Sequence, residues 1–256
     1  MTGSETIQRQ TQLKILLVGD NCTDIYQYGT VDRLSPEAPV PVFVPTHKEE
    51  KEGMAGNVYA NLVALGCSVD IVCGSSSKKT RLIDSRSKQQ ILRIDEDVSS
   101  IPIVNVDPTG YDAVVISDYN KGVVDYELIE RIIEESGHGT KFPVFIDTKK
   151  VDLERMQGAW VKINELEYSK IKSQCTGLIV TKGAKGAKIV HHNYSAPAPV
   201  VEVVDVTGAG DTFLAALAYN YLHTTDIKRA VDFAIRASSI TVQHLGCYAP
   251  TMEEIL

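Results

Sequence analysis

The sequence lacks the features that mark several large classes of protein. It has no apolar run near the ~20 residues that a membrane-spanning helix needs. Its first 14 residues are polar and have no apolar core of a signal peptide, so we expect residues 1–13 to form a flexible tail. Positive charge is also scarce, with 26 Lys and Arg against 33 Asp and Glu. This balance argues against a nucleic-acid-binding or membrane-surface protein.

Cysteine is scarce as well, and its spacing fits no metal site. The five cysteines, at 22, 67, 73, 175 and 247, form no Cys-x-x-Cys pair. We therefore expect buried thiols in a reducing, cytoplasmic environment rather than disulfides. The sequence also contains no Gly-x-x-x-x-Gly-Lys-Ser/Thr string, which disfavours a P-loop nucleotide-binding protein.

What the sequence does contain is a regular alternation of short apolar runs and amphipathic stretches. The apolar runs predict strands at 15–18, 69–72, 113–116, 144–147 and 178–181. The amphipathic stretches predict helices at 57–65, 126–135, 209–222 and 227–244. Such alternation predicts one α/β domain over 14–256, with a mostly parallel sheet between two layers of helices. Ligands of such sheets bind beyond the carboxyl ends of the strands.

Two stretches, at about 26–52 and 80–95, do not fit this alternation. Prolines interrupt the run 40–44, which restricts that run to a sheet edge, and 81–94 predicts a hairpin turning near 87–88. Together these stretches can form a small β lid that excludes water from a reaction. A plain surface hairpin is the alternative.

The most informative string is Asp-Val-Thr-Gly-Ala-Gly-Asp at 205–211. We expect an apolar strand at 200–204 to enter this turn and a helix to leave it. Free backbone N–H groups at a helix start attract anions, and Gly208 and Gly210 allow a ligand to come close. Asp211 can accept a proton from a substrate hydroxyl while the N–H groups stabilise a transferring phosphoryl group. A helix-capping role for Asp211 is favoured for a lone Gly-x-Gly-Asp, but not for the full string.

This string resembles that of the ribokinase-like (PfkB-type) carbohydrate kinases, which transfer the γ-phosphate of ATP to a sugar hydroxyl. The resemblance implies a three-layer α/β sandwich with a mostly parallel central sheet and a small β lid. It implies that Asp211 is the general base and that Gly208, Ala209 and Gly210 form the anion hole. It also implies Mg²⁺ with ATP as co-substrate, and allows a monovalent cation near Asp205.

A second string, Gly-Met-Ala-Gly-Asn at 53–57, resembles the Gly-Gly-x-x-Asn motif with which this family holds its sugar. Met54 stands where a second glycine is usual. Alone, Asn57 would be interpreted as a helix N-cap and Asp24 as a turn residue. The substrate-binding residues that the resemblance implies are Asp20, Asp24, Gly53, Gly56, Asn57, Arg93, Asp118 and Lys121.

The nucleotide side is implied by two more strings. Asn-Glu-Leu-Glu at 164–167 resembles the family's Asn-x-x-Glu motif, which organises Mg²⁺ and its waters near the ATP phosphates. For these four residues alone, a capped helix start is the favoured alternative. The stretch 181–186 resembles the loop beside the nucleotide and also fits a glycine hairpin. The implied residues are Asn164, Thr181, Lys182, Gly183, Gly186 and Thr207 for the nucleotide, with Glu167 and Asn164 for Mg²⁺.

Three strings, at 33–42, 89–95 and 117–122, look like the heptose 7-phosphate kinase domain of bifunctional ADP-heptose synthesis proteins. This implies phosphorylation of the anomeric hydroxyl of D-glycero-D-manno-heptose 7-phosphate, with Arg93 and Lys121 on the substrate phosphate. Solvated surface charges are the alternative for these two residues. A same-fold kinase for another sugar or nucleoside, and a non-catalytic binding or regulatory homologue, are the alternative functions.

The resemblance is weaker at 73–79 and 170–176, where this family carries additional helix and strand. Ile235 and Cys247 also stand where heptose kinases have Asn and Thr. If the short segments are true deletions, they leave sheet edges and apolar helix faces uncovered. For that reason we expect a homodimer, with ATP and a sugar phosphate as the other partners.

Overall fold

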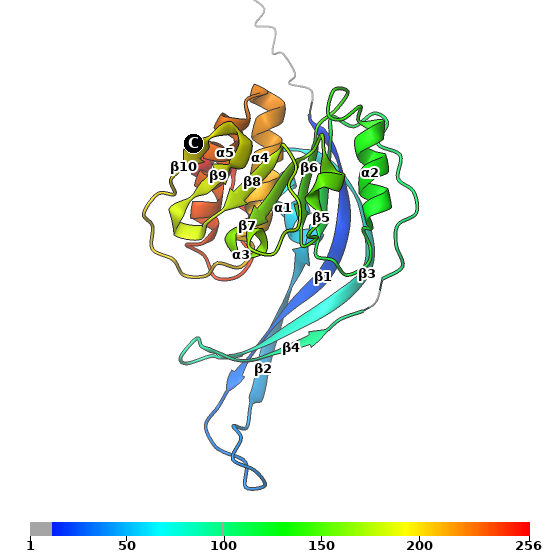
Figure 1. Cartoon of the computed structure of the whole chain (residues 1–256). Helices are drawn as coiled ribbons and strands as arrows, with labels where there is room; N and C mark the ends of the chain where they lie inside the picture. Colours follow the sequence, from blue (N-terminus) through cyan, green and yellow to red (C-terminus); the bar gives the residue numbers. More distant parts are fainter. Residues whose placement is uncertain (1–11, 99) are drawn as a thin grey trace, which may run out of the picture.

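The computed structural model of the chain describes residues 12–98 and 100–256. All but the last two residues of the tail expected at 1–13 lie outside this description. The strands are β1 (Lys14–Thr30), β2 (Val44–Met54), β3 (Ser68–Asp84), β4 (Gln90–Glu96), β5 (Ala113–Asp118), β6 (Val144–Thr148), β7 (Trp160–Asn164), β8 (Leu178–Thr181), β9 (Ala187–Ile189) and β10 (Tyr194–Ala196). They form one sheet in the order β10-β9-β8-β7-β6-β5-β1-β3-β4, with β2 paired to β1 (Figure 1).

The pairing is parallel from β3 through β1, β5, β6 and β7 to β8, and antiparallel where β2, β4, β9 and β10 join. The α-helices are α1 (Ala55–Ala64), α2 (Tyr126–Glu135), α3 (Glu165–Tyr168), α4 (Ala209–Thr224), α5 (Ile227–Thr241) and α6 (Met252–Ile255). Short 3₁₀ turns are η1 (Leu153–Met156), η2 (Gly183–Lys185) and η3 (Val190–His192).

Two separate apolar cores lie on the two faces of the sheet. On one face, Ile15 and Leu17 of β1 pack with buried residues of α1, α4 and α5. On the other face, Leu16 and Val18 pack with buried residues of α2 and η1. Successive residues of a strand point to opposite faces, so a strand covered on both sides is apolar throughout. The three-layer sandwich expected from the sequence is confirmed.

Three predicted strands and one predicted helix are confirmed closely. The strands at 113–116, 144–147 and 178–181 are β5, β6 and β8, and the helix at 126–135 is α2. The carboxylate of Asp125 caps α2 by accepting a 2.7 Å hydrogen bond from the Leu128 N–H. The five cysteines are all free, as expected. Among the described residues, no helix is both long enough and apolar enough to cross a bilayer.

Two strands are much longer than the sequence predicts. The prediction that the first strand ends at Gly19 is wrong, because β1 shifts register near Asp20 and continues to Thr30. The strand predicted at 69–72 likewise continues to Asp84, and the short segment 73–79 lies inside it. Beyond the core these strands supply hydrogen-bond partners to each other and to β2 and β4. That mutual pairing cannot be deduced from either segment alone.

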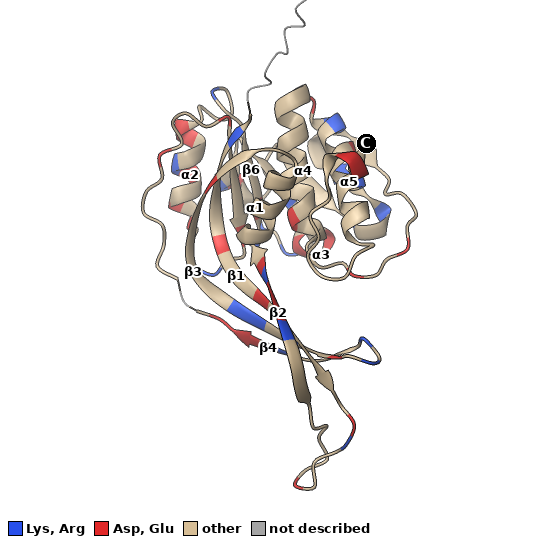
Figure 2. Cartoon of the chain, turned by 180° about the vertical axis from the view of Figure 1, so that it is seen from behind, with Lys and Arg blue, Asp and Glu red and all other residues tan. Residues whose placement is uncertain are grey.

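The far ends of β1 and β3, with β2 and β4, form the predicted lid, which projects from the body (Figure 1). Charged residues of both signs line these lid strands (Figure 2). The strand expected over 40–44 is wrong, since β2 begins only at Val44 and Pro41 makes a single bridge to Leu34. Proline has no N–H to donate to a ladder, so residues 40–43 cannot form a regular strand. The hairpin expected near 87–88 joins β3 to β4.

The strand expected at 200–204 is also wrong. These residues pair with no strand of the described chain, and Val200, Val203 and Val204 are exposed. The N–H groups of Val204 and Asp205 instead donate to the Val242 carbonyl, at 2.8 and 3.2 Å. Prolines at 197 and 199 remove the donors that would extend β10, so the chain leaves the sheet there.

Helix boundaries differ from the prediction by a few residues. Helix α1 begins at Ala55, with Met54 at its N-cap position, so the reading of Asn57 as an N-cap is wrong. Helix α5 ends at Thr241, three residues before the predicted end. The short segment 170–176 is irregular and contains no helix, although Cys175 is buried there.

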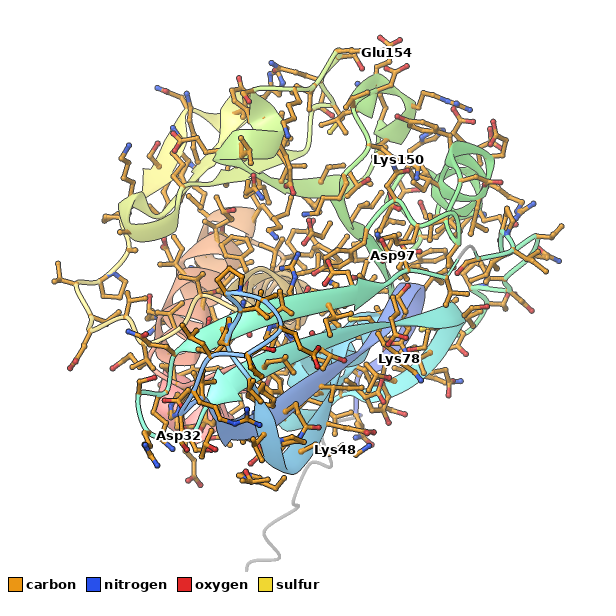
Figure 3. All side chains as sticks on the ribbon, turned by 90° about the horizontal axis from the view of Figure 1, so that it is seen from below. Asp32, Lys48, Lys78, Asp97, Lys150 and Glu154 are labelled. Atoms are coloured by element: carbon orange, nitrogen blue, oxygen red, sulfur yellow. The ribbon has the colours of Figure 1, made fainter. Side chains whose placement is uncertain are left out.

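A buried ion pair fastens the carboxyl ends of β5 and β6. The Lys150 ammonium lies 3.0 Å from Oδ2 of Asp118, and these side chains are 6% and 0% exposed. The ammonium also donates to the Val124 carbonyl at 2.7 Å, and Thr148 Oγ1 donates to Asp118 Oδ2. Figure 3 labels Lys150 in the body of the molecule, away from Asp32 and Lys48 of the lid. Asp118 is therefore a structural carboxylate with its charge compensated inside the protein.

Replacing Lys150 with Met should destabilise the protein by about 3–5 kcal/mol, because the Asp118 charge would stay buried without a cation. The free energy of unfolding in urea measures this effect. Lys170→Met, at an exposed lysine, should change it by no more than about 0.5 kcal/mol. Equal stabilities for the two variants would show that the ion pair contributes nothing.

Candidate active site

Asp211, in the first turn of α4, is a nearly buried carboxylate with one donor on each oxygen. Its exposed fraction is 4%. The Asn57 side chain donates to Oδ2 and the Tyr119 hydroxyl donates to Oδ1, both at 2.8 Å. Burial raises the pKa of Asp211 to about 6, with the nearby charge of Asp147 adding to the rise and both hydrogen bonds opposing it. This carboxylate is ionised at neutral pH and ready to accept a proton.

The turn before Asp211 is shaped by its two glycines. Gly208 has φ 79°, and a Cβ there would approach the Asn57 amide nitrogen to 2.7 Å. A Cβ on Gly210 would come 2.7 Å from the Lys162 ammonium. The Ala209 N–H is used by the Val206 carbonyl at 3.3 Å. The Thr212 N–H donates to the Gly208 carbonyl at 2.9 Å, so within the described chain the N–H groups of Gly210 and Asp211 are the ones left available to an anion.

Lys162 is a catalytic candidate that the sequence reasoning missed. It lies on β7 and is 4% exposed, and its ammonium donates to Asp147 Oδ2 of the neighbouring β6 at 2.7 Å. The other oxygen of Asp147 has no partner among the described residues. The signal was a single charge inside the apolar run Trp-Val-Lys-Ile, since a lysine in a buried strand needs a specific partner. Lys162 places a positive charge directly beside the glycine turn.

Some of the predicted sugar-binding residues, Asp24, Gly53 and Gly56, lie together where β1 leaves the core. Asp24 accepts a hydrogen bond of 2.5 Å from Arg81 of β3, and their side chains are 6% and 13% exposed. Any side chain at Gly53 would overlap Asp24, and one at Gly56 would come 3.0 Å from Asn21 Oδ1. The two glycines therefore let the 53–57 segment lie directly against β1. Arg81 is a second residue that the sequence reasoning missed, because its partner lies 57 positions away.

In the 53–57 segment, Met54 has φ 53°, a backbone conformation that residues other than glycine rarely adopt. Its side chain is only 3% exposed. Met54 stands where the resemblance leads us to expect a second glycine, the residue that adopts a positive φ most readily. The 53–57 segment therefore holds local strain at a buried position.

Asp20 and Asp118 act on the site through the loop 119–121, because their carboxylates accept hydrogen bonds from its backbone. Oδ2 of Asp20 accepts from the N–H groups of Tyr119 and Lys121, at 2.7 and 3.3 Å. Burial raises the pKa of Asp20. Oδ1 of Asp118 accepts from the Asn120 N–H at 2.9 Å, besides its pairing with Lys150. In this geometry the two carboxylates hold the loop 119–121, and Asp20 Oδ1 has no partner within the described chain.

Arg93 and Lys121, which the resemblance places on a substrate phosphate, each have a carboxylate partner. Arg93 Nε lies 2.8 Å from Asp95, and its side chain is 51% exposed. Lys121 Nζ lies 2.5 Å from Asp97. The alternative of solvated surface charges thus fits both residues as the chain stands.

A cavity of about 310 Å³ lies beside the glycine turn, between the 181–186 hairpin and helices α4 and α5. Thr181, Gly183 and Gly186 line it, as the prediction for the nucleotide side requires, and so does Gly210. Apolar side chains form most of its remaining wall, among them Val201, Val206, Phe213, Ile235 and Val242. A cavity of this volume with an apolar wall can hold a flat apolar group such as a nucleobase. Lys182 does not line the cavity; its N–H donates to the Gly186 carbonyl at 2.7 Å, which confirms the hairpin.

Asn164 and Glu167 form a capping box at the start of α3, the alternative that the sequence left open. Each side chain accepts a 2.8 Å hydrogen bond from the other residue's N–H. The second oxygen of Glu167 pairs with Lys149. Within the described chain, no group of three or more His, Cys, Asp or Glu side chains is placed to hold a metal. A metal here would therefore keep most of its water ligands, as Mg²⁺ commonly does.

Asp205 ties the glycine turn to the loop after α5. Its Oδ1 accepts from the N–H and hydroxyl of Thr207, at 2.9 and 2.7 Å. Its Oδ2 accepts from the Gly246 N–H at 2.9 Å. Cys247, next in that loop, is a half-buried thiol whose pKa burial raises to about 12. The loop after α5 thus contributes to the wall of the site.

Known proteins match both the sequence and the fold. The model of the pfkB family carbohydrate kinases matches residues 158–255. The bifunctional protein HldE of a Nitratiruptor species is 35% identical over 303 residues, covering 94% of this chain and 64% of that protein. HldE of Methylococcus capsulatus is 32% identical, covering 94% of this chain and 63% of that protein. The chain thus spans slightly less than two thirds of these relatives' length.

The alignment also bears on the short segments. Its 303 positions include 94% of the 256 residues of this chain, about 241, so about 60 positions lack a counterpart here. Segment 73–79 runs as an unbroken part of β3.

Solved structures show the same fold. Ribokinase from Thermotoga maritima superposes with a TM-score of 0.71 at 18% identity, covering 95% of this chain and 98% of that one. Arabidopsis thaliana ribokinase complexed with ribose and ATP gives 0.71 at 17% identity, covering 96% and 98%. These structures show a ribokinase-like fold, and the family match over residues 158–255 together with the HldE relatives places this chain in the pfkB family of carbohydrate kinases.

Proposed function

We propose that this protein transfers the γ-phosphate of ATP to the anomeric hydroxyl of a sugar phosphate, D-glycero-D-manno-heptose 7-phosphate. The observation that carries the proposal is the ionisable, buried Asp211 carboxylate at the start of α4, held between Asn57 and Tyr119 beside a glycine turn. This arrangement joins a base to an anion-binding helix start, which are the two parts that phosphoryl transfer to a hydroxyl requires. The HldE relatives support the heptose phosphate as substrate.

In the proposed reaction the sugar hydroxyl hydrogen-bonds to Asp211 and gives up its proton as the oxygen attacks the γ-phosphorus. Asn57 can keep one hydrogen on Asp211 while its amide oxygen faces the sugar or Asn61. Asp24, fixed by Arg81, accepts from the hydroxyls of the sugar ring. These contacts orient the acceptor before transfer.

The charge of the transferring phosphoryl group is stabilised by the free N–H groups of the glycine turn and by the Lys162 ammonium beside Gly210. The nucleobase lies in the apolar cavity between the 181–186 hairpin and α5. Asn164 and Glu167 would hold Mg²⁺, largely through water, and the ion would neutralise the ATP phosphates. A monovalent cation near Asp205 is a further part of this proposal.

The lid supports a phosphorylated acceptor over an unphosphorylated sugar or a nucleoside. Lys79 and Arg81 stand opposite Asp24 and Tyr26 of β1, and Arg93 stands opposite Arg81. Residues directly opposite one another share a face of the sheet, so these cations face the sugar site together. Within 12–98 and 100–256, no carboxylate oxygen lies within 4.0 Å of the Lys79 ammonium. Lys79 is thus available to a phosphate.

A homodimer stays a prediction. The outer edge of β3 over Ser68–Ser77 has no strand partner in the described parts of the chain, because β4 pairs only from Lys78 onward. Apolar side chains of the lid, such as Leu92 and Ile94, are 52% and 44% exposed. A second copy covering them would remove an unpaired edge.

Replacing Asp211 with Asn should lower turnover by about 10²–10⁴-fold while ATP binding changes little, since the base is lost but no phosphate donor is. The rate of sugar phosphate phosphorylation and the Kd for ATP measure the two effects. For the wild type, kcat/KM should fall as the pH drops below about 6, because protonated Asp211 cannot act as a base. Asp232→Asn, at an exposed α5 residue, is the control. Full activity of Asp211→Asn would sink the assignment of the base.

Replacing Glu167 with Gln should raise the Mg²⁺ concentration needed for half-maximal activity and lower turnover. Gln can still complete the capping box, so α3 and the midpoint of thermal unfolding should be preserved. Glu165→Gln, an exposed acid in the same helix, should leave the Mg²⁺ titration unchanged. If both variants titrate like the wild type, Glu167 serves only the helix start.

Replacing Lys79 with Met should raise KM for the sugar phosphate by about tenfold or more, as expected for a lost charged hydrogen bond. The neighbouring Lys78, labelled in Figure 3, points to the opposite face of β3 and is the matched control. Lys78→Met should leave KM unchanged. KM values for a panel of sugars with and without phosphate would separate the two variants, and equal effects would remove Lys79 from the substrate site.

A further inference from the structure

We propose that Tyr119 is a positioning residue for the base, whose hydroxyl holds the Asp211 carboxylate in its reactive orientation. This inference rests on the proposed function, because it assigns Tyr119 a role in that reaction. The hydroxyl donates to Oδ1 at 2.8 Å, and Asn57 donates to Oδ2 at the same distance. A carboxylate oxygen can accept two hydrogen bonds, so each oxygen keeps one free position. The two donors therefore fix the rotation of the carboxylate and leave one acceptor position on each oxygen for a substrate hydroxyl.

Hydrogen bonds to two buried carboxylates hold the backbone at Tyr119 and Asn120. Its N–H donates to the buried carboxylate of Asp20 at 2.7 Å. The next residue, Asn120, has φ 58° and donates its N–H to Asp118 at 2.9 Å. Asp118 is in turn neutralised by the buried Lys150. A side chain that only filled space would not need two buried carboxylates to hold its loop.

Two ammonium groups from different elements lie near the ring of Tyr119. Lys79 Nζ, from the lid strand β3, is 5.6 Å from the ring centroid, and Lys149 Nζ, which follows β6, is 5.2 Å from it. Lys149 also pairs with Glu167 of the nucleotide side. Cations over an aromatic face attract its negative quadrupole and so hold the ring in place. Tyr119 thus contacts the lid, the nucleotide side and the base at once.

The charges around this pair come from every neighbouring element. Asp147 of β6 and Lys162 of β7 act on Asp211 from below the sheet end. Lys149 and Lys79 act on the ring, and the neutral thiols of Cys22 and Cys247 lie on the side of β1 and the loop after α5. Burial raises the pKa of the Tyr119 phenol well above its ordinary value, so the hydroxyl stays a neutral donor.

Removing the Tyr119 hydroxyl should shift the pKa of Asp211 in one direction. A hydrogen bond to the ionised form of a carboxyl lowers its pKa. The pKa of Asp211, about 6 with the bond in place, should therefore rise when the Tyr119 hydroxyl is removed. A residue that only supports the fold would lower activity at every pH alike. A positioning residue shifts the pH at which the base becomes active.

Tyr119→Phe keeps the ring and removes only the hydroxyl. The acid limb of kcat/KM against pH should move upward by about one pH unit, so activity at pH 6 should fall more than activity at pH 8. KM for ATP should change little. The matched control is Tyr126→Phe, whose hydroxyl accepts from the Asp152 N–H at 3.0 Å, away from Asp211. This variant should keep the wild-type profile.

A second measurement does not depend on phosphoryl transfer. The folded-state pKa of Asp211 is above the ordinary value of 3.8, so the folded protein holds this proton at a pH where the unfolded chain has lost it. The contribution of Asp211 to stability is therefore greatest at low pH and decreases as the pH rises from about 4 to about 6. Subtracting the Tm of Asp211→Asn from that of the wild type at each pH isolates this decrease.

In the Tyr119→Phe background, the same decrease should extend to about pH 7. A wild type that phosphorylates no sugar, together with this extended decrease, would refute the proposed function but support the hold of Tyr119 on Asp211. An unchanged titration of Asp211 in Tyr119→Phe would overturn the inference, whatever the activity. A uniform loss of activity at all pH values with an unshifted titration would do the same, since it indicates a structural role alone.

Discussion

The site depends on one unfavourable event, the burial of the Asp211 carboxylate at the start of α4. Removing an ionised carboxyl from water is costly unless hydrogen bonds replace the solvent. Here the Asn57 amide and the Tyr119 hydroxyl provide one bond each, and the start of α4 adds a favourable dipole. Asp147 opposes them, so the balance leaves the pKa near 6. Because the hydrogen bonds offset only part of the cost of burying the carboxylate, the pKa of Asp211 lies close to neutral pH.

Other carboxylates at the sheet end are compensated more fully, and they do a different task. Asp118 has Lys150, and Asp147 has Lys162, each pair buried between adjacent strands. Because parallel strands end at the same edge of the sheet, these pairs lie side by side and fasten the strand ends to one another. The Lys162 ammonium also lies beside Gly210, where the proposed reaction has the transferring phosphoryl group. The Asp147–Lys162 pair therefore belongs both to the fold and to the proposed reaction.

The sequence predicts what depends on local pattern and misses what depends on distant partners. Helix α2, strands β5, β6 and β8, and the 205–211 turn follow from periodicity and turn residues in a single stretch. The length of β1 and β3 does not, because each is the other's hydrogen-bond partner in the lid. Tyr119 lies in the stretch 117–122 that resembles the heptose kinases, but its proposed role depends on its hydroxyl reaching a residue 92 positions away. Lys162 and Arg81 were missed for the same reason.

The lid and the catalytic layer are parts of the same two strands. Strands β1 and β3 run from the core into the lid without a break, and Asp24, Arg81 and Lys79 lie just beyond the core on them. A displacement of the lid must therefore bend or twist these strands rather than open a hinge. Lys79 lies over the ring that holds the base, so such a displacement would also reach Asp211. The strained backbone at Met54 stands where β2 returns from the lid to α1, at the turn through which that movement would reach the 53–57 segment.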